Sequence, residues 1–230
     1  MSYQAKAFTV AKAARSGQFE DRSFTTQSTN IYRDSFKRLF DIALVLLLAP
    51  IAVPLIAIFV LIIASTGASP FYSQRRIGKD GVVFDMLKIR TMVPNAKECL
   101  EAYLAMNPAA REEWDCKQKL QDDPRITPIG KILRKSSLDE LPQLWNVLRG
   151  DMSIIGPRPM MEEQKSLYPG RAYYKMRPGI TGPWQVSDRN ATTFAARAQF
   201  DNDYYDNLTL ASDVSILAKT VSVVLRCTGC

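Results

Sequence analysis

The feature that most constrains this chain is an apolar run with two prolines in its middle. Residues 42–64 read IALVLLLAPIAVPLIAIFVLIIA, and no charged residue occurs between Asp41 and Arg75. A helix of about 20 apolar residues is long enough to span a bilayer. Pro50 and Pro54 each remove a backbone donor and tend to bend a helix. The run therefore predicts a membrane-embedded helix with a break at Pro50.

Basic residues flank this run on both sides: Arg33, Lys37 and Arg38 before it, and Arg75, Arg76 and Lys79 after it. A spanning helix usually has its basic flank on one side only, because positive charge stays on the cytoplasmic face. We therefore expect a re-entrant segment over residues 34–70 that enters and leaves through one face. Backbone groups freed at the bend would need partners within the protein. A single span and a buried core helix are the two alternatives.

The apolar run divides the rest of the chain into two parts. Residues 1–33 are polar and lack a periodic apolar face, which predicts a disordered lead-in. Residues 71–230 are expected to form a domain on the cytoplasmic face. The pattern of elements predicts an α+β fold that is mostly helical and monotopic, with a re-entrant membrane helix hairpin, interfacial amphipathic helices and a small β-hairpin.

Charge and composition narrow the chemistry of this domain. The net charge is +7 and the pI is about 9.3, which indicates an anionic partner such as a phosphorylated substrate or a lipid headgroup. Nucleic acid is not expected, because aromatic residues are not interleaved with basic ones on one face. The chain has no histidine, which excludes Ser-His-Asp and Cys-His catalysis and most zinc sites.

A β-hairpin is predicted directly after the apolar run. FYSQRRI and VVFDMLKIR are rich in β-branched and aromatic residues, and residues 78–81 supply the turn. Alternation along the second strand places Lys88 and Arg90 on the same face. Two cations on one face can hold a phosphate or can simply face solvent. Residues 95–121 follow as amphipathic helix broken at Asn107-Pro108.

Asp139 and Glu140 form an acidic pair within a strongly basic neighbourhood. On a helix, neighbouring side chains point about 100° apart, so the two carboxylates cannot do the same job on one atom. One could attack or take a proton while the other holds a metal. The alternative is a surface helix capped by Ser136 or Ser137, with acids in its first turn favoured by the helix dipole.

Two loops rich in proline and glycine each present an arginine. Arg158 lies in IIGPRP, and Arg177 begins RPGITGPWQ. The prolines limit the backbone freedom that is lost when an arginine is fixed on a ligand. Arginine is also the preferred bidentate partner of phosphate, so at least one of the two loops is expected to bind phosphate.

These features resemble the bacterial sugar transferases, the monotopic phosphoglycosyl transferases that start glycan assembly on polyprenol phosphate. The resemblance runs from about Phe36 to the C-terminus. It rests on an ordered set of motifs: Lys37-Arg38, Asp41, Pro50, Gln74-Arg75, Lys88-Ile89-Arg90-Thr91-Met92, Arg134, the run SLDELPQL at 137–144, NVL at 146–148, GDMS at 150–153, GPRP at 156–159, RPGITG at 177–182, Asp201, Tyr204, Asn207 and Asp213.

The resemblance implies that a sugar-1-phosphate, of galactose or glucose, passes from a UDP-sugar to polyprenol (undecaprenyl) phosphate with release of UMP. In this comparison Asp139 is the nucleophile that forms a phosphosugar–aspartyl intermediate, and Glu140 binds Mg²⁺. The residues expected to contact substrate are Lys88, Arg90, Arg134, Arg158, Arg177, Gln185 and Arg189.

The resemblance also implies a place in the cell. The protein is expected at the bacterial inner membrane, on its anionic inner leaflet, with the active site on the cytoplasmic face and in an exopolysaccharide or related glycan pathway. A homodimer is left open. The competing hypothesis is a non-enzymatic, membrane-anchored scaffold or regulator of polysaccharide assembly, which would release no UMP.

Two departures from the family pattern stand out. Ala49 precedes Pro50 where the family often has a serine. Pro183-Trp184 and Ser187-Asp188 stand where the family more often has other residues. These departures concern the helix break and the contacts to sugar or nucleotide, and leave the acidic pair untouched.

Overall fold

The computed structural model describes residues 30–117, 120–187 and 194–225. The fold combines helices with two small sheets, as expected for the α+β class. Most of the predicted lead-in, up to residue 29, lies outside the described residues. The lead-in was predicted to reach residue 33, but residues 32 and 33 are helical. They begin a short π-helical turn, η1 (Tyr32–Phe36), that runs directly into the apolar helix.

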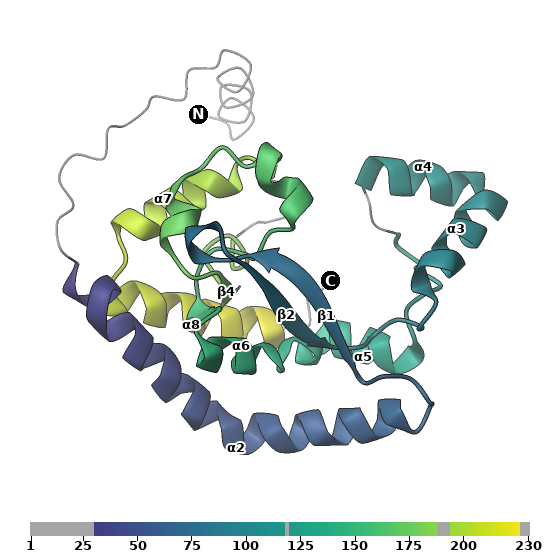
Figure 1. Cartoon of the computed structure of the whole chain (residues 1–230), viewed down its shortest axis with the longest axis horizontal. Coiled ribbons are helices and arrows are strands. Elements are labelled where there is room, and N and C mark those ends of the chain that lie inside the picture. Colours follow the sequence, from purple (N-terminus) through teal and green to yellow (C-terminus); the bar gives the residue numbers. More distant parts are fainter. Residues whose placement is uncertain (1–29, 118–119, 188–193, 226–230) are drawn as a thin grey trace, which may run out of the picture. The chain divides into compact units, whose positions relative to one another are not determined.

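The apolar run folds as one long helix, α2 (Lys37–Ala64), that contains both Pro50 and Pro54. Figure 1 shows that this helix changes direction midway, so that it has two arms. Together with η1 it is long and apolar enough to cross a membrane, and only 11% of its most apolar stretch is buried in the protein. Leu47 is 72% exposed and Leu61 is 70% exposed. The helix thus presents apolar surface along both arms.

The predicted β-hairpin is confirmed. Strand β1 (Phe71–Ile77) pairs antiparallel with β2 (Val83–Ile89), and Gln74 lies opposite Met86. The turn between them is a 3-10 turn, η2 (Lys79–Gly81). In this turn Asp80 has a φ of 57° and Gly81 a φ of 78°. Both values lie in the left-handed region, which glycine and aspartate tolerate better than most residues.

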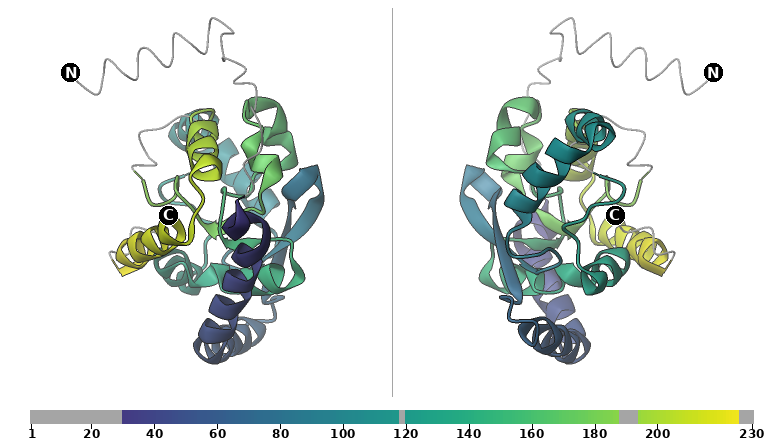
Figure 2. Two further views of the ribbon diagram at one scale, coloured as in Figure 1. Left: turned by 90° about the vertical axis from the view of Figure 1, so that its left-hand side faces the viewer. Right: turned by 90° about the vertical axis from the view of Figure 1, so that its right-hand side faces the viewer.

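The remaining elements are short and follow one another closely. They are α3 (Ala96–Met106), α4 (Pro108–Lys117), α5 (Pro128–Ser136), η3 (Leu138–Glu140), α6 (Gln143–Arg149), β3 (Ser153–Ile155), η4 (Glu162–Leu167), η5 (Ala172–Lys175), β4 (Gly179–Thr181), α7 (Arg197–Asp206) and α8 (Leu210–Leu225). The predicted break at Asn107-Pro108 is confirmed, because α4 begins at Pro108. Figure 2 shows these elements from two further sides.

The two arginine-bearing loops meet in the second sheet. Strands β3 and β4 pair in parallel, with Ser153 opposite Gly179 and Ile155 opposite Thr181. A Cβ added at Gly179 would lie 2.1 Å from the backbone nitrogen of Gly156, so no larger residue fits. The glycines of GPRP and RPGITG therefore allow two backbones to approach each other closely.

The main core lies between α2, the β-hairpin and the C-terminal helices. Buried Val45 of α2 packs in it with Met86, Val147, Ile155 and Tyr204. Burial of this apolar surface is the main contribution to the stability of the domain. Because Val45 belongs to the first arm of α2, that arm is part of the folded domain rather than a separate anchor.

A buried polar group, which we call the anchor cluster, fixes the start of α2. Its members are Tyr32, Lys37, Asp41, Ser153, Tyr204 and Asp213. The ammonium of Lys37 lies 2.8 Å from Asp41 and 3.2 Å from Asp213. Asp41 also accepts hydrogen bonds from the Ser153 hydroxyl and the Ile154 backbone. Asp213 accepts bonds from Tyr32 and Tyr204. Every charge in the cluster is paired, which is the condition for burying it.

Candidate functional site

The acidic pair lies at a sharp joint between two helices. Helix α5 begins at the Thr127 cap, whose hydroxyl accepts a hydrogen bond from the Gly130 backbone. It ends at Ser137, which adopts a left-handed conformation with a φ of 58°. A single 3-10 turn, η3, then carries Asp139 and Glu140 before α6 starts. Ser137 stands at the N-cap position of this turn, but its side chain makes no cap hydrogen bond, so the alternative of a serine-capped helix is not confirmed.

Lys88 of the hairpin reaches the acidic pair. Its ammonium lies 2.8 Å from a carboxylate oxygen of Glu140 and 3.9 Å from one of Asp139. The side chain of Asn146 holds β2 against α6 by accepting from the Leu87 amide and donating to the Asp85 carbonyl. Because Leu87 precedes Lys88, these bonds set where the lysine points.

Asp139 is the more buried of the two acids. It is 8% exposed, and burial raises the pKa of its carboxyl above the ordinary value. The positive charges of Lys88 and Arg134 oppose this effect, whereas the neighbouring Glu140 adds to it. In the described part of the chain, the Lys88 ammonium is the closest charged partner of Asp139, at 3.9 Å. Its carboxylate is therefore poorly solvated, and two cations favour its charged form against the effect of burial.

Arg134 stands behind the acidic pair on α5. Its guanidinium donates to the Thr91 hydroxyl at 2.9 Å, which directs the side chain toward the acids. Burial lowers the pKa of Arg134, and the nearby Asp139 works against that shift. A half-buried guanidinium is still charged at neutral pH, so the site holds two cations beside two carboxylates.

These residues line an open cleft of about 1120 Å³. One part of its wall is polar and carries Lys88, Arg134, Asp139 and Glu140. Another part is apolar and is built by the two long helices, with Leu48, Ile51 and Leu55 from α2 and Leu217 and Val223 from α8. A molecule with a charged head and an apolar tail fits a cleft of this composition.

Most of the other predicted site residues also lie in the cleft. Arg90, Arg158 and Gln185 line it. Arg90 donates to the carbonyls of Ser69 and Phe71, and Gln185 donates to the Ile180 carbonyl. Thus the structure brings the acidic pair together with five of the seven residues that we expected to contact substrate.

One predicted residue, Arg177, is not brought to the cleft, and the nearby Arg38 makes contacts of the same kind. Arg177 is absent from its walls and donates to the Gly150 carbonyl at 2.8 Å. Arg38 donates to the carbonyls of Val147 and Leu148. The two arginines therefore satisfy carbonyls at the C-terminal end of α6, where cations are favoured. Arg189 lies outside the described residues.

Sequence reasoning missed several residues that shape this region. Thr91 and Asn146 orient Arg134 and β2 through hydrogen bonds across the fold. Arg197 lies at the start of α7, where its guanidinium stacks on Trp184 at 3.9 Å. Trp184 was visible only as a departure from the family pattern. Thr91 and Asn146 belong to motifs of the family pattern but had no role assigned to them, and no local signal marks Arg197 as a site residue.

The acidic pair also has the donor set that a magnesium ion requires. Within the described ranges, no three His, Cys, Asp or Glu side chains gather at one point. Magnesium is commonly held by one or two carboxylates together with substrate phosphates and water. Asp139 and Glu140 supply that number of carboxylates in one cleft, so the residues fit a substrate-assisted magnesium site.

A cleft with paired carboxylates, two cations and an apolar helical wall is suited to phosphate chemistry on a lipid. The chain belongs to the bacterial sugar transferase family, whose model matches residues 32–227. It is 45% identical over 207 residues to the UDP-galactose-lipid carrier transferase of Erwinia amylovora, covering 88% of this chain and 43% of that protein.

Two further relatives are of similar closeness. The exopolysaccharide production protein ExoY of Sinorhizobium fredii is 48% identical over 197 residues, covering 84% of this chain and 87% of that protein. The undecaprenyl-phosphate galactose phosphotransferase of Salmonella typhimurium is 46% identical over 195 residues, covering 84% and 41% respectively. The chain thus spans less than half of the Erwinia and Salmonella relatives and most of the Sinorhizobium one.

Proposed function

We propose that this protein transfers a sugar-1-phosphate from a UDP-sugar to polyprenol phosphate and releases UMP. The observation that carries the proposal is the acidic pair with Lys88 and Arg134 in a cleft whose other wall is apolar. The names of the Erwinia and Salmonella relatives support galactose-1-phosphate as the group transferred. Glucose-1-phosphate is the second candidate, since the two sugars differ in one stereocentre.

The reaction would proceed by two displacements at one phosphorus atom. An oxygen of Asp139 attacks the sugar-linked phosphate, the bond from phosphorus to the UMP oxygen breaks, and a phosphosugar–aspartyl ester forms. An oxygen of polyprenol phosphate then attacks the same phosphorus and releases Asp139. Splitting one difficult step into two is the advantage of a covalent intermediate.

Neighbouring residues would prepare Asp139 for this attack. Its carboxylate sits in a half-desolvated position, which leaves it more reactive than one fully hydrated. Lys88 and Arg134 balance its charge and would hold phosphate oxygens as charge develops on them. Glu140 would hold Mg²⁺, which when bound neutralises the diphosphate and eases the departure of UMP.

Trapping the adduct tests this proposal directly. Incubating the purified protein with UDP-galactose alone should add the mass of a hexose phosphate to the peptide containing Asp139. Asp139→Asn should show no adduct. Asp85→Asn is a matched control, because Asp85 is exposed on the same hairpin and its carboxylate accepts a hydrogen bond from Ser73 outside the cleft. An adduct on another residue, or no UMP release with any UDP-sugar and polyprenol phosphate, would refute the mechanism.

We further propose that α2 is a re-entrant membrane segment at the inner membrane, with the cleft on the cytoplasmic face. Three features support it: the midway bend with Pro50 and Pro54, the exposed apolar side chains on both arms, and the basic flanks on both sides. On this view residues 71–230 form the cytoplasmic-face catalytic domain. The exposed Trp145 and Ile132 of α6 and α5 suit an interfacial position.

Cysteine labelling separates this topology from a single span. In a variant without the 4 native cysteines, cysteines introduced at Ser35 and Ser73 should both react with a membrane-impermeant maleimide only from the cytoplasmic side. Labelling of one of them from the periplasmic side would establish a spanning helix instead. This outcome would leave the proposed chemistry standing.

A further inference from the structure

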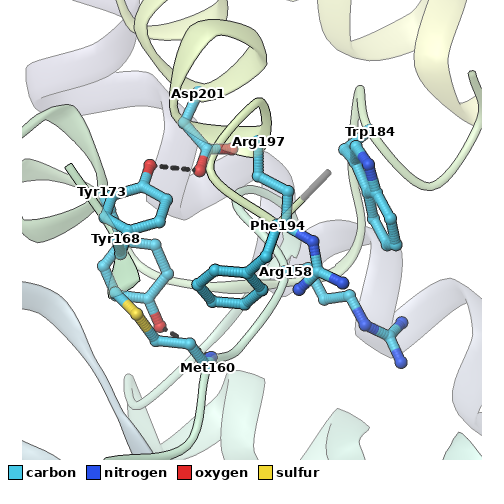
Figure 3. A pocket seen from close by; sticks show the side chains of 8 residues that line it. All are labelled: Arg158, Met160, Tyr168, Tyr173, Trp184, Phe194, Arg197 and Asp201. Carbon is cyan, nitrogen blue, oxygen red and sulfur yellow. Dashed lines mark hydrogen bonds between the residues drawn. The ribbon is translucent and has the colours of Figure 1, made fainter. Parts of the chain in front are cut away.

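A second, smaller pocket adjoins the cleft at the far side of Arg158. It is lined by Arg158, Met160, Tyr168, Trp184, Arg197 and Asp201, among others, and Figure 3 shows them. Arg158 lines both this pocket and the cleft, so its side chain lies between the two. Two guanidinium groups in this pocket lie beside one indole ring, with carbon Cζ of Arg197 at 3.9 Å and that of Arg158 at 5.9 Å from the centre of Trp184.

A third arginine belongs to the same group. Arg76 of β1 donates to Gln74, whose side chain lines the cleft, at 2.7 Å. After burial, the charge of Arg158 is the next cause that lowers the pKa of both Arg76 and Arg197. The charge of Arg158 therefore acts on both, and we call Arg76, Arg158 and Arg197 the arginine cluster.

The arginine cluster has little to neutralise it within the described residues. In this part of the chain, none of its members lies within salt-bridge distance of a carboxylate. Asp201 lines the small pocket and its charge raises the pKa of Arg197, but its carboxylate also accepts a hydrogen bond from the Tyr168 hydroxyl, and burial raises its own pKa to about 6. Glu163 acts on Arg76 more weakly than Arg158 does.

Two buried donors in the cluster lack an acceptor among the described residues. They are the Nε atoms of Arg76 and Arg197. Buried donors without a protein acceptor are rare in folded proteins, so each of these two nitrogen atoms points to a ligand that it can bond. Three cations that repel one another, with two unsatisfied donors, form an arrangement that an anion would complete.

We propose that the arginine cluster is an anion subsite that holds the phosphate remaining with the nucleotide when the sugar phosphate leaves. The inference rests on the proposed function, which supplies a donor with two linked phosphates. Lys88 and Arg134 flank Asp139 and so serve the phosphate under attack, whereas Arg158 leads from the same cleft to the cluster. On this proposal, the second phosphate of the donor lies on the Arg158 side of the phosphate under attack.

The position of the cluster favours the nucleotide over the lipid. Its pocket is built from the region around η5 and α7, whereas the apolar cleft wall comes from α2 and α8. In Figures 1 and 2, α7 lies at the opposite end of the domain from the second arm of α2. A water-borne ligand therefore reaches the cluster without passing the membrane-facing arm.

Equilibrium binding of UMP to the full-length protein in detergent tests the subsite. Arg76→Gln and Arg197→Gln should each weaken UMP binding by about tenfold or more, since each removes charge-assisted hydrogen bonds to phosphate. Arg75→Gln is the matched control, because Arg75 is the next residue on β1, is 69% exposed, and pairs with Glu162 instead. Arg197→Lys keeps the charge and should retain most of the affinity, which a purely structural role would not predict.

Farnesyl phosphate, a short lipid phosphate, tests in parallel whether the cluster binds the phosphate of the lipid instead of the phosphate of the nucleotide. Its affinity should change less than twofold in all of these variants. Wild-type affinity for UMP in both Arg76→Gln and Arg197→Gln would overturn the subsite, and so would a selective loss of farnesyl phosphate binding. If the glutamine variants do not fold, UMP should still change the tryptophan fluorescence of the wild type, and Trp184→Phe should remove that change. A wild type without this response would overturn the proposal.

Turnover of the wild type separates this inference from the function on which it rests. A wild type that binds UMP through the cluster but releases none from UDP-sugars would overturn the proposed function alone. A wild type that turns over, with variants whose UMP affinity and KM for the UDP-sugar are unchanged, would overturn the subsite alone.

Discussion

The acidic pair and the anchor cluster are built from the same parts. Each has one lysine placed between two carboxylates. In the anchor cluster Lys37 lies 2.8 Å from Asp41 and 3.2 Å from Asp213, and in the cleft Lys88 lies 2.8 Å from Glu140 and 3.9 Å from Asp139. The composition of a charged cluster therefore does not tell a structural site from a reactive one.

The two clusters differ in how far their carboxylates are exposed and in what they face. Asp41 and Asp213 have side chains that are 2% and 0% exposed, and both accept further hydrogen bonds from protein donors. The side chains of Asp139 and Glu140 are 11% and 25% exposed and face a cleft. A carboxylate enclosed by protein donors holds two elements together, whereas one that lines a cavity can reach a ligand.

The largest expected difference between the two clusters is in catalysis. Asp139→Asn removes the nucleophile and should reduce UMP release by at least about 10³-fold, because no other group can form the covalent intermediate. Asp41→Asn should retain wild-type turnover per folded molecule. Both are measured with UDP-galactose and polyprenol phosphate, after normalising to the folded fraction. Equal losses of turnover in the two variants would show that the two clusters do not differ in catalysis.

The free energy of unfolding should instead fall in the anchor-cluster variant and not in the cleft variant. Asp41→Asn leaves the buried Lys37 ammonium with one carboxylate instead of two, and should cost about 3 kcal/mol of unfolding free energy. For a chain of this size that corresponds to a melting temperature lower by roughly 6–12 °C. The melting temperature in detergent checks this, with Asp34→Asn as the control because Asp34 is exposed and pairs with the adjacent Arg33. An unchanged melting temperature would show that the anchor cluster does not stabilise the fold.

The metal dependence of turnover should distinguish the two acids of the cleft. Glu140→Gln should reduce turnover by about 10²-fold and flatten its dependence on Mg²⁺ concentration, because an amide is a poor ligand for this ion. Glu113→Gln, on α4, leaves the cleft intact and serves as the control. A Glu140→Gln variant with wild-type magnesium dependence would show that other groups hold the metal ion.

The smallest expected effect is on the stability of the cleft itself. Because the pKa of Asp139 is raised in the folded state, folding favours its protonated form, and the wild type loses stability as pH rises from the ordinary aspartate pKa through the raised one. The neutral Asp139→Asn should therefore be slightly more stable than the wild type at neutral pH. The difference should vanish in acid. A less stable Asn variant at pH 7 would show that Asp139 is satisfied in the way that Asp41 is.

Local sequence signals predicted the elements better than the contacts between them. The hairpin was predictable because alternation and a glycine turn are properties of adjacent residues, and the helix break at Asn107-Pro108 was predictable because proline interrupts a helix. Motif likeness identified Asp139 and Glu140. The roles of residues 100 or more positions apart, such as Lys37 and Asp213, depend on tertiary packing and have no local signature.

Arg177 and Arg197 are two residues whose contacts could not be predicted from the nearby sequence. Arg177 lies in a proline-flanked loop of the kind that binds phosphate, yet its guanidinium caps α6. Arg197 lies in a stretch without a motif, yet it shares a pocket with Arg158. What a side chain touches was decided by the pairing of β3 with β4 and by the packing of α7, and neither can be read from single residues.

The side chain of Asn146 has a consequence for how this protein meets other molecules. It accepts from the Leu87 amide and donates to the Asp85 carbonyl, the two groups that the outer edge of β2 would offer to another strand. One amide therefore occupies the place of a neighbouring strand, at the edge where exposed hairpins tend to recruit other chains. A two-stranded sheet can in this way stay two-stranded, although an open edge would invite aggregation.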